Sequence, residues 1–355
     1  MSEKNNLSFK IGKKEMGPGQ PVFIVAELSG NHNQSFERAK ELVKVACRAG
    51  ADAIKTQTYT PDTLTINCDK EWFQIKVNEA WAGQTLYSLY KTAYTPWEWL
   101  PEMKKIAESY GVPFFSSVFD ETAVDFCEKM GVPAYKIASF ELTDSELLKK
   151  VASTKKPVII SRGMSTFSEL NEAVTTLRAN GTSEIAILHC VSSYPAKPEE
   201  MNLATIIDLK KRFPEVVIGL SDHTLGISAA VASVALGASI IEKHFTLRRA
   251  DGGPDAGFSL EPAELKTLVQ TVREVEKAIG QAQYDSGQKE AENIIFRRSL
   301  FVVKNIKAGE KFGRENVRCI RPGYGLSPKY LPEVLGKKAA KDIEWGTPLT
   351  WDLIS

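Results

Sequence analysis

The chain has 355 residues and a formal net charge of +1 at pH 7, so neither nucleic acid nor an anionic membrane surface is indicated as a partner. Hydrophobic residues make up 43% and charged residues 25%, which is ordinary for a soluble globular protein. The N-terminal residues lack the apolar core of a signal peptide, and no apolar run approaches the ~20 residues that span a bilayer. The five cysteines are scattered and odd in number, which predicts reduced thiols in a cytoplasmic protein rather than a disulfide or zinc framework.

After a short predicted hairpin at residues 8–20, strands and helices are expected to alternate. The first apolar strand is predicted at residues 22–26. A helix at 36–48 follows, with Phe36, Ala39 and Leu42 on one face and Gly50 at its end. Further strands are predicted at residues 51–58, 113–118, 134–139, 157–161, 185–191, 216–220 and 238–243. Further helices are predicted at residues 97–110, 121–130, 144–153, 167–179, 202–212, 227–236 and 262–279.

This alternation indicates one large α/β domain. Near-continuous apolar strands between amphipathic helices are typical of a parallel sheet that is covered on both faces. Eight such units within about 250 residues match a closed (β/α)8 barrel, or TIM barrel. An open doubly wound sheet is the alternative, but no Gly-x-Gly-x-x-Gly follows the first strand. We therefore predict a catalytic barrel domain at residues 1–280, with the N-terminal hairpin included.

The pattern changes after Gly280. A polar stretch follows, and it predicts a linker at residues 281–296. Residues 297–355 contain short apolar runs between turn residues, which predicts a second domain of about 60 residues, a size of marginal independent stability. We expect this small domain to dock on the barrel or on another subunit.

Polar side chains stand at the C-terminal end of every predicted strand, where barrels of this type carry their chemistry. Buried lysines cost free energy unless they are paired, and lysines beside serine hydroxyls suit a phosphate or carboxylate ligand. A single strand-end lysine is more often part of an ion pair, but eight ends that agree favour one shared site. These residues are Glu27, Lys55, Gln57, Ser116, Ser117, Lys136, Ser139, Ser161, Arg162, Ser192, Ser193, Ser221, Asp222, His223, Glu242, Lys243 and His244.

Two of the four histidines, His223 and His244, follow neighbouring predicted strands. Neighbouring parallel strands lie about 4.8 Å apart, so both imidazoles could reach one divalent ion such as Mn²⁺, Zn²⁺ or Co²⁺. Zinc hydrolases keep three protein ligands, so two histidines favour a Lewis acid that polarises a carbonyl. His189 lies inside an apolar run and is expected to be a core residue, whereas His32 is open to either interpretation.

The connection between residues 59 and 94 is long and rich in aromatic residues, including Trp72, Trp81 and Tyr90. Long loops after barrel strands usually carry function. These aromatics are expected either to stack on a sugar or close a lid, or to pack a flap on the barrel rim.

Several ordered motifs resemble the sialic acid synthase family of nonulosonate synthases. The resemblance implies a barrel followed by an antifreeze-like (SAF) domain, a domain-swapped homodimer, and condensation of phosphoenolpyruvate with an amino sugar. It also implies a divalent metal ion, Mn²⁺ first, with Mg²⁺ or Co²⁺ as alternatives. The motifs are Ala26-Glu27-Leu28-Ser29-Gly30-Asn31-His32, Lys55-Thr56-Gln57, Lys136-Ile137-Ala138-Ser139, Ser221-Asp222-His223-Thr224, Glu242-Lys243-His244-Phe245, Ser259-Leu260-Glu261-Pro262 and Arg321-Pro322-Gly323.

The resemblance assigns roles residue by residue. Glu27 matches the catalytic acidic residue, and His223 and His244 match the metal ligands. Ser192 stands where sialic acid synthases have an asparagine. Phosphoenolpyruvate is expected at Lys55, Ser117, Lys136, Ser139, Ser161, Ser192 and Ser221. The sugar is expected at Gln57, Tyr194, Asp255 and Arg321, the last of these offered by the partner subunit's small domain.

Departures from the sialic acid pattern concern the sugar. Sialic acid synthases have a histidine after the aspartate that matches Asp255, and this chain has Ala256 there. The segment resembles the pseudaminic acid synthase branch, whose sugar is 2,4-diacetamido-2,4,6-trideoxy-L-altrose. Ala256 and Phe258 suit a sugar without the 6-hydroxyl. Arg162 stands where the branch has threonine, and it would alter the phosphate contact if it pointed into the site.

Other interpretations stay open from the sequence. The product could be legionaminic or N-acetylneuraminic acid. A Schiff-base aldolase would need one lysine in an apolar pocket, whereas Lys55, Lys136 and Lys243 all stand beside polar groups. A catalytically silent sugar-binding protein is the alternative from another class, and intact Glu27 and both histidines argue against it.

Overall fold

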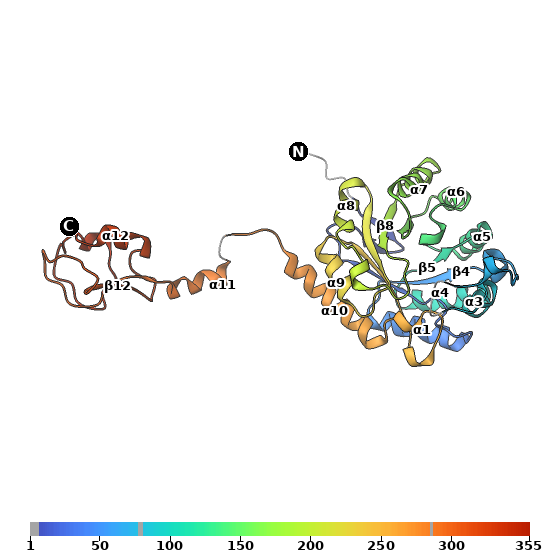
Figure 1. Cartoon of the computed structure of the whole chain (residues 1–355), viewed down its shortest axis with the longest axis horizontal. Coiled ribbons are helices and arrows are strands. Elements are labelled where there is room, and N and C mark those ends of the chain that lie inside the picture. The colour runs from blue at the N-terminus through green and yellow to red at the C-terminus, as the bar shows by residue number, and fades with distance from the viewer. Residues whose placement is uncertain (1–6, 77–80, 285–286) are drawn as a thin grey trace. The chain divides into compact units, whose positions relative to one another are not determined.

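The structure is a computed structural model that describes residues 7–76, 81–284 and 287–355, and it divides into two compact units, Met1–Gly280 and Gln281–Ser355. Unit 1 is a closed parallel barrel wrapped by helices (Figure 1). The prediction of a (β/α)8 barrel is therefore confirmed, and the open doubly wound sheet is wrong. In barrel order the strands are β10 (Ile240–His244), β3 (Phe23–Glu27), β4 (Ala53–Thr58), β5 (Phe114–Val118), β6 (Tyr135–Ile137), β7 (Val158–Arg162), β8 (Ile185–Cys190) and β9 (Val217–Asp222).

Helices follow the strands as the hydrophobic periodicity predicts. The first begins after Ser35, whose side chain accepts the Arg38 amide, and ends at Gly50, whose φ of 99° lies in the left-handed region. One expected helix, at residues 97–110, begins with a 3-10 turn at Trp97–Trp99 before the α-helix starts. The helices around the barrel are α1 (Phe36–Ala49), α4 (Leu100–Ser109), α5 (Glu121–Met130), α6 (Ser145–Ser153), α7 (Phe167–Ala179), α8 (Thr205–Arg212), α9 (Ser228–Ala235) and α10 (Pro262–Ile279).

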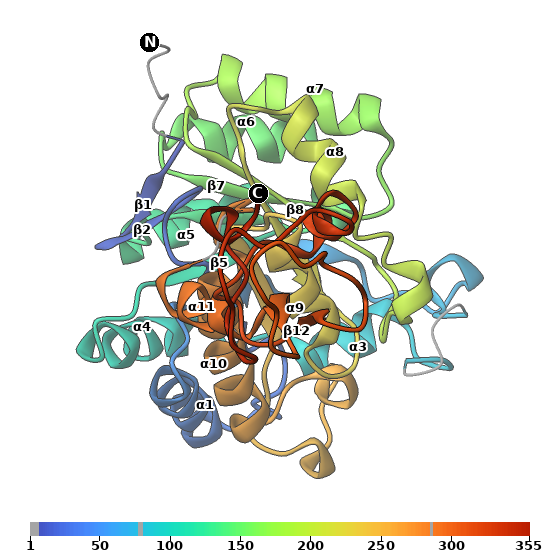
Figure 2. The same ribbon diagram turned by 90° about the vertical axis from the view of Figure 1, so that its left-hand side faces the viewer.

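The N-terminal hairpin, β1 (Phe9–Ile11) and β2 (Lys14–Met16), closes one end of the barrel (Figure 2). Phe9, Ile11 and Met16 share a buried cluster with inward-facing residues near the starts of the strands, such as Phe23 and Ala53. The apolar layer at this end leaves the opposite, C-terminal end of the barrel for polar side chains.

The connection after β4 contains two short helices, α2 (Pro61–Leu64) and α3 (Leu86–Ala93). The indole of Trp97 donates to the Tyr59 carbonyl, and the Tyr59 ring lies 5.7 Å from that of Tyr90. Part of this connection therefore packs as a flap on the barrel rim, which is one of the two roles expected for its aromatic residues.

Unit 2 has its own small core. Strands β11 (Ser299–Val302) and β12 (Val317–Ile320) pair antiparallel, and α12 (Leu331–Val334) follows them. The expected linker at 281–296 is not wholly irregular, because α11 (Gln288–Ala291) and a 3-10 turn at Glu292–Phe296 form within it. Buried residues of the core include Leu300, Val302, Ile306, Phe312, Val317, Ile343 and Leu349.

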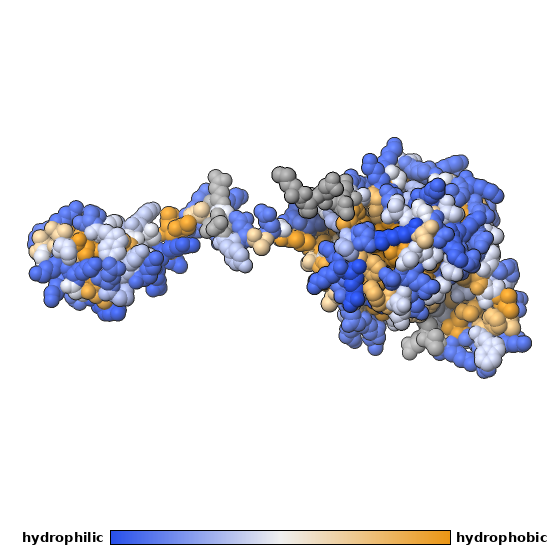
Figure 3. Space-filling model, turned by 90° about the horizontal axis from the view of Figure 1, so that it is seen from above, coloured by the Kyte–Doolittle hydropathy of each residue, from blue (hydrophilic) through white to orange (hydrophobic). Residues whose placement is uncertain are grey.

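Hydrophilic side chains cover much of the visible surface of each unit, and smaller hydrophobic patches are scattered among these side chains (Figure 3). Within the described residues, no helix combines the length and apolar character that a membrane crossing requires.

Candidate active site

The two-residue period of a strand decides which strand-end side chains enter the barrel. In β10, Glu242 and His244 share one face, and Lys243 lies on the other. Lys243 forms a fully buried ion pair with Asp222 of β9 at 2.8 Å, so it belongs to the layer between strands and helices. The alternation places one polar residue from each strand in a common inner layer, which consists of Glu27, Lys55, Ser117, Lys136, Ser161, Cys190, Ser221 and Glu242.

Lys55 is the centre of one half of this layer. Its Nζ forms an ion pair with Glu27, lies 3.6 Å from Glu242 Oε1, and donates to Ser117 Oγ over 3.0 Å. Burial raises the pKa of Glu27 despite the opposing effect of Lys55. Burial disfavours the charged form of Lys55 too, but Glu242 and Glu27 outweigh it, and the pKa of Lys55 is raised. The lysine is therefore a cation held between carboxylates.

Lys136 is the centre of the other half. It is 2% exposed, and its Nζ donates to Ser161 Oγ over 2.7 Å and to the Ile137 carbonyl over 2.9 Å. Among the described residues, no carboxylate lies within ion-pair distance of this amine. Burial accordingly holds the pKa of Lys136 below its usual value, although Glu242 acts in the opposite sense. An anion beside Lys136 would supply the charge that the protein omits.

Two serines expected at phosphoenolpyruvate lie together just after the ends of β6 and β8. Ser139 and Ser192 are hydrogen-bonded through their hydroxyls at 2.8 Å. Gly163 approaches both so closely that a Cβ there would lie 2.2 Å from Ser192 Oγ and 2.6 Å from Ser139 Cβ. Ser221, from β9, donates to Glu242 Oε1 over 2.9 Å. The backbone of the loop after β7 therefore packs directly against the serine pair.

Arg162 does not enter the site. Its guanidinium donates to the carbonyls of Gly163 and Ser165 at 3.2 and 3.3 Å, and lies 3.4 Å from His189 Nδ1. His189 Nε2 lies 2.5 Å from the Met201 carbonyl, and since a carbonyl only accepts, Nε2 carries the proton. His189 is therefore a buried core residue, as expected from the sequence, and it is neutral. Because Arg162 points away from the site, its side chain does not contact the phosphate position directly.

His223 and His244 lie side by side at the mouth of the barrel, with ring centroids 5.3 Å apart. His223 Nδ1 donates to the Val191 carbonyl over 2.9 Å, which leaves its Nε2 for a ligand. His244 Nδ1 is buried without a hydrogen-bond partner in the described part of the chain, and it lies 3.7 Å from Asp255 Oδ2. Across residues 7–76, 81–284 and 287–355, no group of three or more His, Cys, Asp or Glu is placed to hold a metal. The protein ligands that this site could offer to a metal are therefore the two imidazoles.

Of the four residues expected at the sugar, three lie in the barrel unit and one lies in unit 2. Tyr194 lies against His223, with ring centroids 4.5 Å apart, and Asp255 accepts a hydrogen bond from Ser29 Oγ. Gln57 donates to the same Ser29 hydroxyl over 3.3 Å. Arg321 lies in unit 2, where it is exposed. Asp255 and Gln57 therefore meet at the Ser29 hydroxyl, and Tyr194 lies against the histidine pair.

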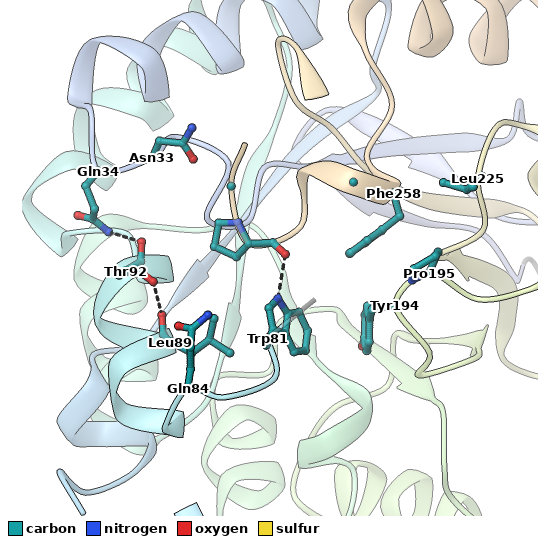
Figure 4. Close-up of a pocket in the computed structure, with 13 residues that line it drawn as sticks. Asn33, Gln34, Trp81, Gln84, Leu89, Thr92, Tyr194, Pro195, Leu225 and Phe258 are labelled. Carbon is teal, nitrogen blue, oxygen red and sulfur yellow. Dashed lines mark hydrogen bonds between the residues drawn. The ribbon is translucent and has the colours of Figure 1, made fainter. Parts of the chain in front are cut away.

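Two residues of this region, Glu242 and Trp81, stood among the strand ends and loop aromatics of the sequence analysis but were assigned no ligand there. Glu242 contacts Lys55 and Ser221 and lies on β10, the strand that carries His244. The two-residue period from His244 could have identified it as an inward-facing residue. Trp81 lies beside a pocket of about 770 Å³ that Tyr194 and Phe258 also line (Figure 4). Its place depends on the course of the long connection after β4, for which the sequence carries no periodic signal.

Comparisons with known proteins agree with this arrangement. The model of the NeuB family matches residues 42–284, and that of the SAF domain matches residues 297–355. A pseudaminic acid synthase of Campylobacter jejuni is 46% identical, and the match covers 92% of this chain and 95% of that protein. A pseudaminic acid synthase of Helicobacter pylori is 41% identical, with coverage of 94% and 98%.

A solved structure is also similar. The N-acetylneuraminic acid (sialic acid) synthetase of Leptospira borgpetersenii, crystallised with citrate, superposes with a TM-score of 0.72 at 32% sequence identity. The superposition covers 81% of this chain and 95% of that one.

Proposed function

The chain belongs to the NeuB family, and we propose that it catalyses the reaction of a pseudaminic acid synthase. In that reaction, phosphoenolpyruvate, 2,4-diacetamido-2,4,6-trideoxy-L-altrose and water give pseudaminic acid and phosphate. The observation that carries the proposal is the pair of buried amines, Lys55 and Lys136, each bonded to a serine hydroxyl at the end of the barrel that also holds the histidine pair.

Phosphoenolpyruvate fits the inner polar layer because it carries a carboxylate and a phosphate close together. Lys136 supplies a cation that has no carboxylate partner among the described residues, and it is bonded to the Ser161 hydroxyl. Ser139 and Ser192 supply two more hydroxyls, which pack against Gly163 in the loop after β7. Lys55 already pairs with Glu27 and lies 3.6 Å from Glu242, so its contribution to an added anion is smaller. We therefore place the more highly charged phosphate group near Lys136.

The histidine pair fits a divalent metal ion, with Mn²⁺ proposed first and Mg²⁺ or Co²⁺ as alternatives. The Val191 carbonyl fixes the proton of His223 on Nδ1, and His244 has a buried, unpartnered ring nitrogen. His223 and His244 would hold the ion, with oxygen atoms of water and substrate as further ligands. When bound, the ion would polarise the sugar's C1 aldehyde.

The residues around the reacting carbons account for the remaining chemistry. Carbon 3 of phosphoenolpyruvate attacks the aldehyde carbon, water adds at carbon 2, and carbon 2 then expels phosphate together with the bridging oxygen. Positive charge develops at carbon 2 before water adds, and the buried Glu27 carboxylate would stabilise it or accept the proton of the water. The Ser29 amide, which donates to Glu27 Oε1 over 2.9 Å, holds this carboxylate in place.

We further propose a homodimer in which the small domain of one chain serves the barrel of the other. Support comes from the match of residues 297–355 to the SAF domain and from the exposed position of Arg321 in unit 2. The proposed location is the cytoplasm, since all five cysteines are free thiols.

The test is phosphate release from phosphoenolpyruvate with Mn²⁺ and each of three sugars. The proposal expects the highest kcat/KM with the 2,4-diacetamido-trideoxyaltrose, and recovery of a labelled bridging oxygen in the phosphate. Higher kcat/KM with N-acetylmannosamine or with the legionaminic acid precursor would assign another nonulosonate. Failure to release phosphate with any of the three sugars would indicate a binding protein. Turnover that survives chelation of the metal, together with covalent trapping by borohydride, would indicate a Schiff-base enzyme.

A further inference from the structure

An apolar pocket adjoins the histidine pair and opens between the flap and the loops after β8 and β10. We infer that three aromatic rings of this pocket, Trp81, Tyr194 and Phe258, select the sugar by its methyl and acetamido groups. This inference, which rests on the proposed function, assigns Trp81 and Phe258 as specificity-determining residues. The pocket has a volume of about 770 Å³, and the three rings face the same space (Figure 4).

The three rings, called the aromatic wall below, are continuous with the histidines. The Tyr194 ring lies 5.6 Å from Trp81 and 5.6 Å from Phe258. Tyr194 lies 4.5 Å from His223, and Phe258 lies 4.9 Å from His244. A sugar whose aldehyde carbon is at the histidines would therefore extend its remaining carbons along these rings.

The polar groups of the pocket are largely engaged with the protein. Trp81 Nε1 donates to the Pro254 carbonyl over 2.9 Å, which occupies the only polar atom of the indole. The Gln34 amide donates to the carbonyls of Thr92 and Tyr94, and the Asn33 amide donates to those of Asp251 and Gly252. What these groups leave for a ligand is apolar ring surface and side-chain carbonyl acceptors, which suit methyl groups and amide N–H groups.

The same surface is less favourable for a sugar that carries hydroxyls at these positions. A hydroxyl that leaves water for an aromatic surface loses hydrogen bonds that the wall does not replace. Discrimination of this kind is limited, because a hydrophobic pocket rejects an added hydroxyl by only about 10- to 100-fold. The wall would therefore set a preference among related sugars and not an absolute requirement.

The test compares Trp81→Ala and Phe258→Ala with a matched control, Trp72→Ala. Trp72 lies in the same connection after β4, is 76% exposed and does not line the pocket. The readout is the ratio of kcat/KM for the 2,4-diacetamido-trideoxyaltrose to that for N-acetylmannosamine, together with KM for phosphoenolpyruvate. We expect the ratio to fall by about tenfold or more in both wall variants and to stay unchanged in the control, with KM for phosphoenolpyruvate within twofold of the wild type.

Phe258 is only 4% exposed, so Phe258→Leu is a second variant that preserves most of the buried volume, and circular dichroism checks its folding. A wall that selects the sugar predicts an intermediate ratio for Phe258→Leu. Equal losses for both sugars, or a loss of the ratio in Trp72→Ala, would overturn the inference. If both wall variants keep the wild-type preference for the 2,4-diacetamido-trideoxyaltrose, the role of the aromatic wall is contradicted and the proposed function is not. If the wild type itself prefers N-acetylmannosamine, the proposed function is contradicted as well.

Discussion

Lys243 and Asp222 face each other in register across β10 and β9 and form an ion pair at 2.8 Å, with both side chains fully buried. Lys243 also donates to the Thr224 carbonyl, and Asp222 accepts the Thr224 amide over 2.9 Å. Because Thr224 follows His223 directly, this ion pair braces the segment that presents the first histidine of the site.

Removal of one partner of this pair should be costly. Lys243→Ala leaves the Asp222 charge buried and unpaired, and we expect the free energy of unfolding to fall by about 3–5 kcal/mol. The measurement is urea unfolding followed by tryptophan fluorescence. The matched control is Lys149→Ala, which breaks an exposed pair with Glu146 of similar length, 2.7 Å, and should cost at most about 1 kcal/mol. Equal losses in the two variants would contradict the structural role of Lys243.

Arg162 should affect phosphoenolpyruvate through the loop that it holds. Its guanidinium binds the carbonyls of Gly163 and Ser165, and Gly163 packs against Ser139 and Ser192. For Arg162→Thr we expect KM for phosphoenolpyruvate to rise about tenfold, which corresponds to about 1.4 kcal/mol, with kcat and KM for the sugar within threefold of the wild type.

The control for this variant is Arg178→Thr, on α7, whose guanidinium pairs with Glu215 at the surface. It should leave all three kinetic parameters unchanged. If Arg162→Thr raised the two KM values together, Arg162 would have a general structural role and not a role in positioning the serine pair.

His32 should make stability depend on pH. Its Nδ1 accepts the Gln34 amide, so the proton is on Nε2, which contacts Thr95 Oγ1 at 3.0 Å. Burial lowers the pKa of His32 from 6.5 to about 4. As the pH falls below 6.5, His32 takes up a proton in the unfolded chain, whereas in the folded protein it takes one up only near pH 4. The free energy of unfolding therefore decreases as the pH falls from 6.5 to about 4, by up to roughly 3 kcal/mol.

The measurement for His32 is the difference in unfolding free energy between the wild type and His32→Gln at pH 7, 5.5 and 4. The variant does not titrate, so the wild type should lose stability relative to it as the pH falls through the window. A difference that stays constant with pH would show that the pKa of His32 is the same in the folded and the unfolded protein, and would contradict this prediction.

Metal binding should depend on the two histidines of the mouth. In His223→Ala or His244→Ala, we expect Mn²⁺ affinity, measured by calorimetry without substrates, to fall by more than about 100-fold, because only one imidazole remains. His189→Gln is the control, since His189 lies on the neighbouring strand with its nitrogens engaged by Met201 and Arg162. Mn²⁺ that binds either alanine variant as it binds the wild type would refute the site.

Much of the barrel could be predicted because its signals are local. The apolar runs, the helix caps and Gly50 place most elements within a few residues of their observed bounds. The strand ends likewise identified Glu27, Lys55, Lys136 and His244, because parallel strands bring their C-terminal ends to one edge. Glu242 was among these strand ends but received no ligand, although the two-residue period from His244 places both side chains on the same face of β10.

Arg162 and Trp81 show where local reasoning stops. Arg162 neighbours Ser161 in the sequence, but the pleat of β7 sends the two side chains to opposite faces, so one bonds Lys136 and the other holds the loop. Trp81 reaches the pocket because its indole bonds to the Pro254 carbonyl, a partner 173 residues away.

By itself the sequence determined the alternation of strands and helices, the list of polar strand ends and the family resemblance, since all three depend on residue type and short spacing. Only the tertiary structure decided which of those polar groups face one another, because closure of the barrel sets the register between strands. It separated Lys243, which pairs with Asp222 outside the barrel, from Lys136, whose buried amine has no carboxylate partner among the described residues. It also placed Trp81 and Phe258 beside the histidine pair, through contacts that span the chain.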